Sequence, residues 1–329
     1  MIIKNILSVA LICVFIVSCN GKKTSQKTTL LDSTGNINHV SVVISNDLWN
    51  GSVGDAVRNV LATPIYGLPQ DEPMFTIAHI PPSVFSGFVT KNRTILIIEL
   101  GKDAAVTVKD NVYAQPQKVI TVSGKSKETI IEALQMNKDE IIRLFRNEEI
   151  AERQRQMNLS LHSTITLQDS LDITVDFPSI YKLIKEDGDF FWYSKDIASS
   201  SGSMHLMFYD IPYDAVKKND STINQIIKIR DSVGKVEVPG RLEGSYMGTE
   251  NAYTPFHDKT EIDGKFAYET KGLWDLKNAF MAGPFLNYTI EDKKNNRWVV
   301  AEGFVFSPSV DKRNYMLEVE AILKTLKIK

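Results

Sequence analysis

Apolar positions along this chain of 329 residues change their spacing several times, and each change predicts a different element. His39 to Ser45 is a β-branched run, which is typical of a strand. Apolar residues at positions 53, 57, 60 and 61 then recur at helical spacing, and Ser52 to Asp55 resembles a capping box that would open this helix. Thr94 to Leu100 is apolar on both faces, so we expect a central strand covered on both sides.

A long helix is predicted from about Ser126 to Met157, with an apolar stripe that ends near Phe145. The stretch 148–156 is almost wholly polar, and Glu149 stands four residues before Arg153, the spacing of a helical ion pair. A helix whose last turns lose their apolar stripe has left its own core. We therefore expect this helix to join two halves, with the boundary near residue 158.

The second half is richer in aromatic strands. Leu171 to Phe177 alternates apolar and acidic or hydroxyl residues, the period-two pattern of a half-buried strand. Further strands are predicted at 190–193, 204–209, 266–270, 285–290 and 298–306, and helices at 223–233 and 315–326. The pattern predicts an α+β fold of two α/β sandwich-type halves with mainly antiparallel sheets, over 39–157 and 158–329.

The first 38 residues indicate export and lipid attachment. After Lys4, the apolar run from Ile6 to Val17 is too short to span a bilayer, and Ser18 precedes Cys19. The stretch 16–19 resembles the bacterial lipobox, which implies a signal peptide over 1–18 and an acylated Cys19. An uncleaved membrane anchor is the alternative. Residues 19–38 are polar and aperiodic, so we expect a flexible tether.

The tether also bears on location. Surface-exported lipoproteins of Bacteroidetes carry acidic residues directly after the lipidated cysteine, whereas the first acid here is Asp32. We therefore expect a protein anchored in the outer membrane by its lipid and facing the periplasm. Cys13 falls within the removed segment, so the mature chain would contain no disulfide.

Composition is that of a globular protein, with 43% hydrophobic and 24% charged residues and a formal net charge of −2. Without a basic stripe, nucleic acid is not an expected partner. No nucleotide-binding loop, serine-hydrolase elbow or dinucleotide fingerprint occurs, so no cofactor is expected. The histidines lack the spacing of a zinc site, and no metal is predicted; they are His39, His79, His162, His205 and His257.

Six short segments with distinctive residues occur in order along nearly the whole mature chain: Asp47 to Gly51, Leu68 to Phe75, Gly244 to Glu250, Gly272 to Trp274, Phe280 to Phe285 and Gly303 to Pro308. Together they resemble the signature segments of a family of Bacteroidetes lipoproteins with a domain of unknown function. The resemblance implies no activity. The carboxy-terminal half is also similar, more loosely, to PsbP-like α/β/α sandwiches.

The stretch 240–258 is rich in Gly, Tyr, Thr and acids and predicts a functional loop. If it folds over the sheet, a cleft for a sugar or peptide would be lined by Arg241, Tyr246, Glu250, Tyr253 and Trp274. The alternative is that the aromatic residues pack in the core while Arg241 and Glu250 form surface ion pairs.

Two classes of function follow. One is a non-catalytic lipoprotein that binds an envelope protein or a small ligand. The alternative is an envelope enzyme acting on glycan or peptide, with Glu250 and a second acid as its acid and base.

Three smaller motifs each allow a structural or a functional interpretation. Ser33 and Ser221 follow aspartates, as in the Asp-Ser/Thr sequon at which Bacteroidetes attach O-glycans, although helix caps and turns also favour such pairs. Gly283 before Pro284 predicts a sharp entry into a strand. The acids Asp71 and Glu72 lie between prolines, where a turn or a partner contact would explain them.

Overall fold

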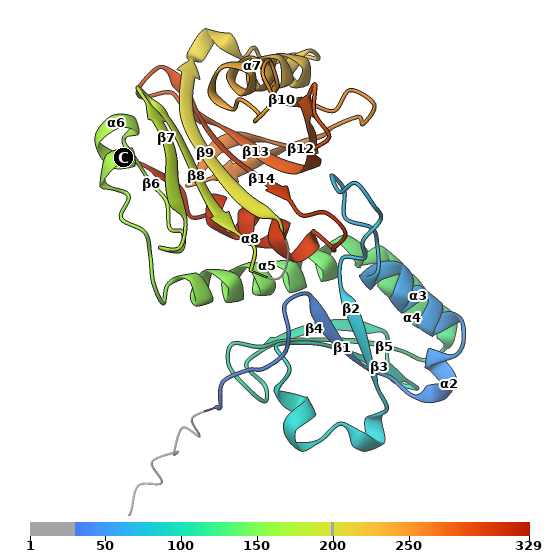
Figure 1. Ribbon diagram of the computed structural model, residues 1–329. Helices are drawn as coiled ribbons and strands as arrows, with labels where there is room; N and C mark the ends of the chain where they lie inside the picture. Colours follow the sequence, from blue (N-terminus) through green and yellow to red (C-terminus); the bar gives the residue numbers. More distant parts are fainter. Residues whose placement is uncertain (1–29, 199–200) are drawn as a thin grey trace, which may run out of the picture.

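The structure is a computed structural model that describes residues 30–198 and 201–329. The predicted signal peptide, Cys19 and the start of the predicted tether lie outside the described residues. The fold is α+β in two halves, as predicted, and Figure 1 shows helix α5 (Lys138–Met157) running between them. No helix in the described part of the chain is both long and apolar enough to cross a bilayer.

The amino-terminal half contains a five-stranded sheet in the order β2-β1-β3-β5-β4. The first three pairings are parallel and β4 pairs with β5 antiparallel. Helices lie between β1 and β2 in the sequence and form a crossover connection. Two strands joined by such a crossover can run parallel, whereas a short hairpin turn would make them antiparallel. The strands are β1 (His39–Val43), β2 (Thr76–Ile80), β3 (Thr94–Leu100), β4 (Ala105–Asp110) and β5 (Lys118–Gly124).

β3 is the central strand of this sheet, as its two apolar faces predict. One face packs on helices, and the other is covered by the two short 3-10 turns. The helical elements of this half are α2 (Asn46–Trp49), α3 (Ser52–Leu61), η2 (Pro82–Val84), η3 (Gly87–Lys91), α4 (Lys127–Met136) and α5 (Lys138–Met157). The predicted capping box is wrong, because Gly51 is the N-cap of α3 and no side chain caps it.

The predicted single helix 126–157 is interrupted. Asn137 ends α4 and begins α5, with φ −107° and ψ 13°, outside the helical range. The predicted pair between Glu149 and Arg153 is also wrong, because Glu149 points into the protein. It accepts hydrogen bonds from Arg93 at 3.0 Å and from the Asn38 backbone N–H at 2.8 Å. Arg153 instead pairs with Glu318 at 3.5 Å.

Residues 31–38 do not extend as a free tether. The Ser33 N–H donates to the Gln115 carbonyl at 3.0 Å, and the Thr34 N–H donates to the Lys91 carbonyl at 2.9 Å. Asn38 is fully buried. The tether prediction is therefore wrong for these residues, because their backbone pairs with the edge of the amino-terminal half.

The carboxy-terminal half contains an eight-stranded antiparallel sheet in the order β10-β12-β13-β14-β9-β8-β7, with β11 also paired to β12. Its strands are β7 (Lys182–Asp187), β8 (Phe190–Asp196), β9 (Ser203–Pro212), β10 (Tyr246–Thr249), β11 (Phe256–Ile262), β12 (Lys265–Lys277), β13 (Ala282–Asp292) and β14 (Arg297–Phe306). The short β6 (Ile173–Thr174) and β15 (Lys327–Ile328) pair separately. The predicted strand 171–177 is thus mostly wrong, since α6 (Ile165–Leu171) ends where it would start.

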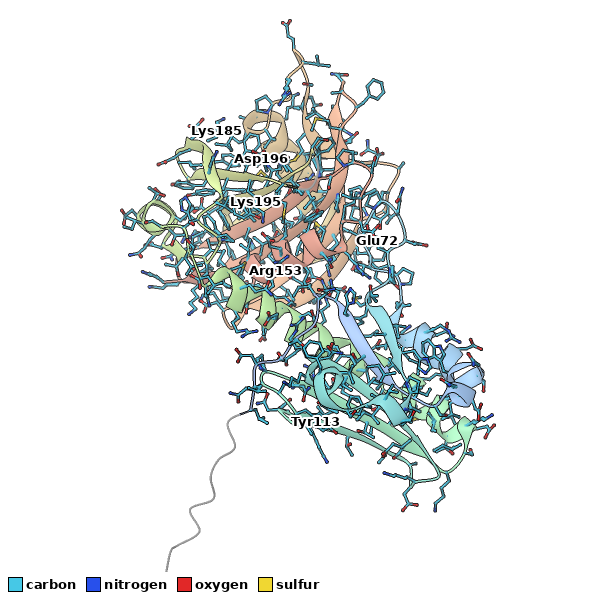
Figure 2. All side chains as sticks on the ribbon, turned by 60° about the horizontal axis from the view of Figure 1, so that its bottom comes forward. Glu72, Tyr113, Arg153, Lys185, Lys195 and Asp196 are labelled. Carbon is cyan, nitrogen blue, oxygen red and sulfur yellow. The ribbon has the colours of Figure 1, made fainter. Side chains whose placement is uncertain are left out.

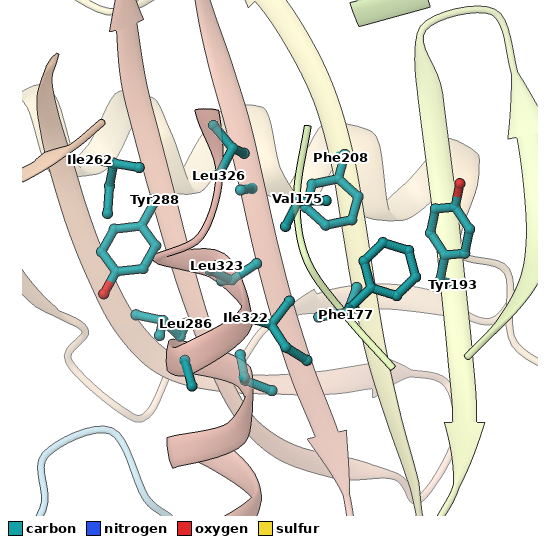
Figure 3. Packing of buried hydrophobic residues seen from close by; sticks show 14 of the residues in the cluster. Val175, Phe177, Tyr193, Phe208, Ile262, Leu286, Tyr288, Ile322, Leu323 and Leu326 are labelled. Atoms are coloured by element: carbon teal, nitrogen blue, oxygen red, sulfur yellow. The ribbon is translucent and has the colours of Figure 1, made fainter. Parts of the chain in front are cut away.

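Each face of this sheet carries a helix. α7 (Thr222–Glu237), which follows the turn η4 (Tyr213–Ala215), covers one face, and α8 (Arg313–Leu323) covers the other. Figure 3 shows the core on the α8 side, where Ile322 and Leu323 meet Tyr288 and Phe208 of the strands. Period-two alternation places one set of side chains on each side, so the α7 face has a separate aromatic core.

The two halves contact each other through α5, α8 and the loop before β2. Glu72 of this loop, labelled in Figure 2, accepts the backbone N–H of Lys312 at 2.8 Å and of Arg313 at 2.8 Å. Its carboxylate therefore caps α8 of the other half. Arg146 of α5 pairs with Glu320 of α8, both largely buried.

Candidate functional site

The predicted loop 240–258 is only partly irregular. Its middle forms β10, an edge strand in which Thr249 pairs with Trp274 of β12, and Phe256 begins β11. Strand pairing therefore fixes residues that the sequence suggested would be free to fold over the sheet.

The five residues predicted to line one cleft are divided among separate places. Trp274 and Arg241 line the same cavity, whereas Tyr246 lies in a different groove, beneath Lys235. The Tyr253 hydroxyl accepts the Gly67 N–H at 3.0 Å, where the halves meet. The Glu250 carboxylate accepts the Ala252 N–H at 2.8 Å and does not line the cavity. The prediction of a single cleft lined by all five residues is therefore wrong.

The cavity that contains Trp274 has a volume of about 300 Å³ and lies on the α7 face of the large sheet. We call it the aromatic cavity. It is bounded by β7 to β10, β12, β14 and the segment after α7. The lining residues that matter below are Trp192, Ser194, Ser203, His205, Trp274 and Phe304, with Arg241 at its rim.

Strand register brings these side chains together. His205 pairs across the sheet with Ser194 on one side and with Phe304 on the other, so the three share a face. Trp274 reaches the same face from β12, and its ring N–H donates to the Val305 carbonyl at 3.2 Å. That close approach requires Gly283, because a Cβ there would lie 1.9 Å from the same carbonyl oxygen. Gly283 thus makes room within the sheet, and the predicted sharp strand entry is not its main role.

His205 has a partner at each ring nitrogen. The Trp192 indole N–H lies 3.1 Å from His205 Nδ1, and the Ser203 hydroxyl lies 2.7 Å from Nε2. An indole N–H can only donate, so Nδ1 must accept and Nε2 carries the proton. The ring also stacks on Phe304, with ring centroids 4.5 Å apart.

Burial lowers the pKa of His205 to about 4, so the ring is neutral at pH 7. Because Nε2–H donates to Ser203, this nitrogen cannot also accept the serine proton. A serine nucleophile requires a base that takes its proton. The arrangement therefore positions the Ser203 oxygen without activating it.

Four residues of the aromatic cavity were not predicted as site residues from the sequence: Trp192, Ser203, His205 and Phe304. Period-two spacing places Trp192 with Ser194, and Ser203 with His205, on common faces, so part of the signal was present. The order of the strands in the sheet brings these pairs next to each other and to Phe304, and the spacing of residues along the sequence does not reveal that order.

The two predicted glycosylation serines differ in exposure. The Ser33 hydroxyl oxygen is buried without a hydrogen-bond partner, so in this folded state it is closed to a glycosyltransferase. Ser221 is exposed at the start of α7 and hydrogen-bonds only to Asn219 and Gln225. Glycosylation at Ser221 stays a prediction. Among residues 30–198 and 201–329, no group of three or more His, Cys, Asp or Glu side chains is arranged to hold a metal ion.

Comparison with protein families gives two matches. Residues 160–325 match a domain of unknown function, DUF4837, and residues 33–158 match another, DUF8532. Together they cover both halves of the fold. The prediction of a family of unknown function is confirmed. No curated protein matches the chain.

Solved structures give weak likenesses. LpqN, involved in cell envelope biogenesis of Mycobacterium tuberculosis, is 11% identical with a TM-score of 0.28, covering 48% of this chain and 83% of its own. The Ran-binding protein Mog1p of Saccharomyces cerevisiae is 9% identical with a TM-score of 0.29, covering 48% and 90%. Human StAR-related lipid transfer protein 5 is 9% identical with a TM-score of 0.24, covering 53% and 97%. At these TM-scores the likenesses carry no argument about function.

Proposed function

Because this chain belongs to the DUF4837 family, a domain of unknown function, we propose a function from its own geometry: it is a non-catalytic envelope lipoprotein that binds a small ligand in the aromatic cavity. The acyl chains on Cys19 would hold it in the outer membrane, facing the periplasm. The proposal includes envelope proteins as partners of the anchored body.

The aromatic cavity is the observation that carries this proposal. Its volume of about 300 Å³ lies at the lower end of the range for small-molecule sites. Tryptophan and phenylalanine rings form its walls, and a few polar groups lie among them, which is the usual composition of a ligand site. Both ring nitrogens of His205 are hydrogen-bonded within the protein, which favours binding over catalysis.

The alternative, an enzyme acting on glycan or peptide, has less support. Its candidate acid, Glu250, lies outside the cavity lining, and its carboxylate is occupied by the backbone of its own loop. The Ser203 oxygen accepts a hydrogen bond from His205 Nε2–H, so Ser203 lacks the base that a nucleophile needs.

Titration with a neutral apolar dye tests the binding site. N-phenyl-1-naphthylamine should gain fluorescence on adding the soluble mature protein, because the dye leaves water for the aromatic walls. Ser194→Phe places a ring in the cavity and should weaken dye binding by about tenfold or more. Ser170→Phe, on the exposed surface of α6, is the matched control. Unchanged binding by the Ser194 variant, or no binding by the parent, would show the proposal to be wrong.

Fractionation of cells tests the anchor. The full chain should sediment with membranes, and Cys19→Ala should move it to the soluble fraction without the acyl mass. Membrane sedimentation at an unchanged mass would exclude lipid attachment at Cys19.

A further inference from the structure

Most polar groups on the walls of the aromatic cavity are already used within the protein. The Trp274 indole N–H donates to Val305, and the Trp192 indole N–H donates to His205. Both nitrogens of His205 have partners. These side chains therefore present only ring faces and edges to a ligand. The polar groups that stay available are the hydroxyls of Ser194 and Ser203.

The rim adds one cation. Arg241 is exposed on the turn after α7, and among the described residues it forms no ion pair. Glu243, two residues further on, is also exposed and does not pair with it. The guanidinium can therefore meet an anion at the mouth without breaking an existing contact.

Exposed apolar side chains occur in the cavity lining and next to lining residues in the sequence. Ile184, which lines it, is 52% exposed, and Leu242, directly after Arg241, is 61% exposed. Phe280, beside the lining residue Met281, is fully exposed. The Asn278 side-chain amide donates to the Gly244 carbonyl at 3.2 Å, so the turns that carry Phe280 and Leu242 are adjacent.

These features distinguish between classes of ligand. A sugar presents many hydroxyls, and burying them among ring faces without partners is unfavourable. A cationic ligand would face Arg241 without a counter-charge. A neutral apolar ligand would fill the cavity but gain nothing at the rim.

We propose that the occupant is a free single-chain amphiphile with one anionic head, a carboxylate or a phosphate. Its chain lies among Trp192, Trp274 and Phe304, and its head pairs with Arg241. This inference rests on the proposed function, since it names the ligand of the same cavity.

Displacement of the bound dye tests the inference. Decanoate, decanol and decyltrimethylammonium share one chain length and differ in the charge of the head. The two ionic compounds are added below their critical micelle concentrations, and decanol is added below its solubility limit. Decanoate should displace N-phenyl-1-naphthylamine at roughly tenfold lower concentration than the other two, a preference of about 1.4 kcal/mol.

Variants at the rim separate charge from shape. Arg241→Gln should weaken the binding of decanoate by about tenfold and leave the binding of decanol unchanged. Arg241→Lys should keep most of the preference for decanoate over decanol. Lys294→Gln removes one positive charge from an exposed turn between β13 and β14 and should change neither.

The outcomes distinguish this inference from the function on which it rests. If the dye does not bind, or binds without regard to Ser194→Phe, the proposed function fails. If the dye binds in the cavity but the three amphiphiles compete equally, or Arg241→Gln has no effect on decanoate, only the anionic ligand is overturned. The inference is also overturned if the protein binds phosphatidylglycerol vesicles while free decanoate does not displace the dye, because the anion recognised would then be a membrane headgroup.

Discussion

His205 shows how one buried ring can fix the chemistry of a cavity. The Trp192 indole N–H donates a hydrogen bond to Nδ1, and Nε2–H donates one to the Ser203 hydroxyl oxygen. The stacked Phe304 ring removes water from one face. Protonation would break the Trp192 hydrogen bond and place a charge among apolar rings, so the neutral form is strongly favoured.

The buried His205 ring should make the stability of the folded protein sensitive to acid. Its pKa is 6.5 when unfolded and about 4 when folded, so the unfolded chain binds more protons between these values. The free energy of unfolding should therefore fall as the pH decreases from about 6.5 to about 4. Between pH 7 and pH 5 the contribution of this residue is about 2 kcal/mol.

Urea denaturation at pH 7 and pH 5 measures the effect. His205→Gln keeps a donor and an acceptor but cannot titrate, so its loss of stability over this interval should be smaller by that amount. His162→Gln is the matched control for the loss of an imidazole at another position. Equal losses for His205→Gln and the parent would contradict the assigned neutral state.

At the scale of elements, α8 depends on a residue from the other half of the chain. Its first N–H groups have no partner within the helix, and no side chain at its N-cap, Lys312, satisfies them. The buried carboxylate of Glu72 accepts from Lys312 and Arg313 instead, and the negative charge also suits the positive end of the helix. The pair Asp71 and Glu72, considered above as a turn or a partner contact, thus includes an internal cap.

Removing this cap should destabilise the protein. Glu72→Ala leaves two buried N–H groups unsatisfied and should lower the free energy of unfolding by roughly 2 kcal/mol. Asp71→Ala, at the exposed neighbouring position, is the matched control and should change it by less than about 0.5 kcal/mol. Hydrogen exchange should show faster opening of the first turn of α8 in the Glu72 variant. Equal stability of the two variants would rule out a capping role.

At the scale of the molecule, ion pairs between α5 and α8 join the halves. Burial by itself would raise the pKa of Glu320, but Arg146 and then Lys324 outweigh it and hold that pKa far below its ordinary value. Glu318 pairs with Arg153 of α5 and with Lys195 of β8. Charges this deeply buried are tolerated only while each has its partner, so the two halves constrain one another.

Unfolding should therefore be a single cooperative transition. Glu320→Gln leaves Arg146 largely buried without its counter-charge and should lower the stability of the whole protein by roughly 3 kcal/mol. Glu140→Gln breaks an exposed ion pair with Arg143 on α5 and should leave the transition temperature nearly unchanged, because an exposed pair contributes little. Differential scanning calorimetry checks both statements. Two separate transitions, with only one shifted by Glu320→Gln, would mean that the halves fold independently.

The sequence by itself determined the elements whose spacing is regular, such as the doubly covered strand 94–100, the aromatic strands of the second half and the last helix. Spacing is a local property of the backbone, so it can be read without knowing the neighbours. Only the tertiary structure decided which strands lie side by side, and hence that Trp192, His205 and Phe304 meet while Glu250 and Tyr253 lie apart from the cavity. It also placed Glu72 against a helix 240 residues further along the chain. Such contacts depend on how whole layers bury their apolar faces, and no short stretch of sequence contains that information.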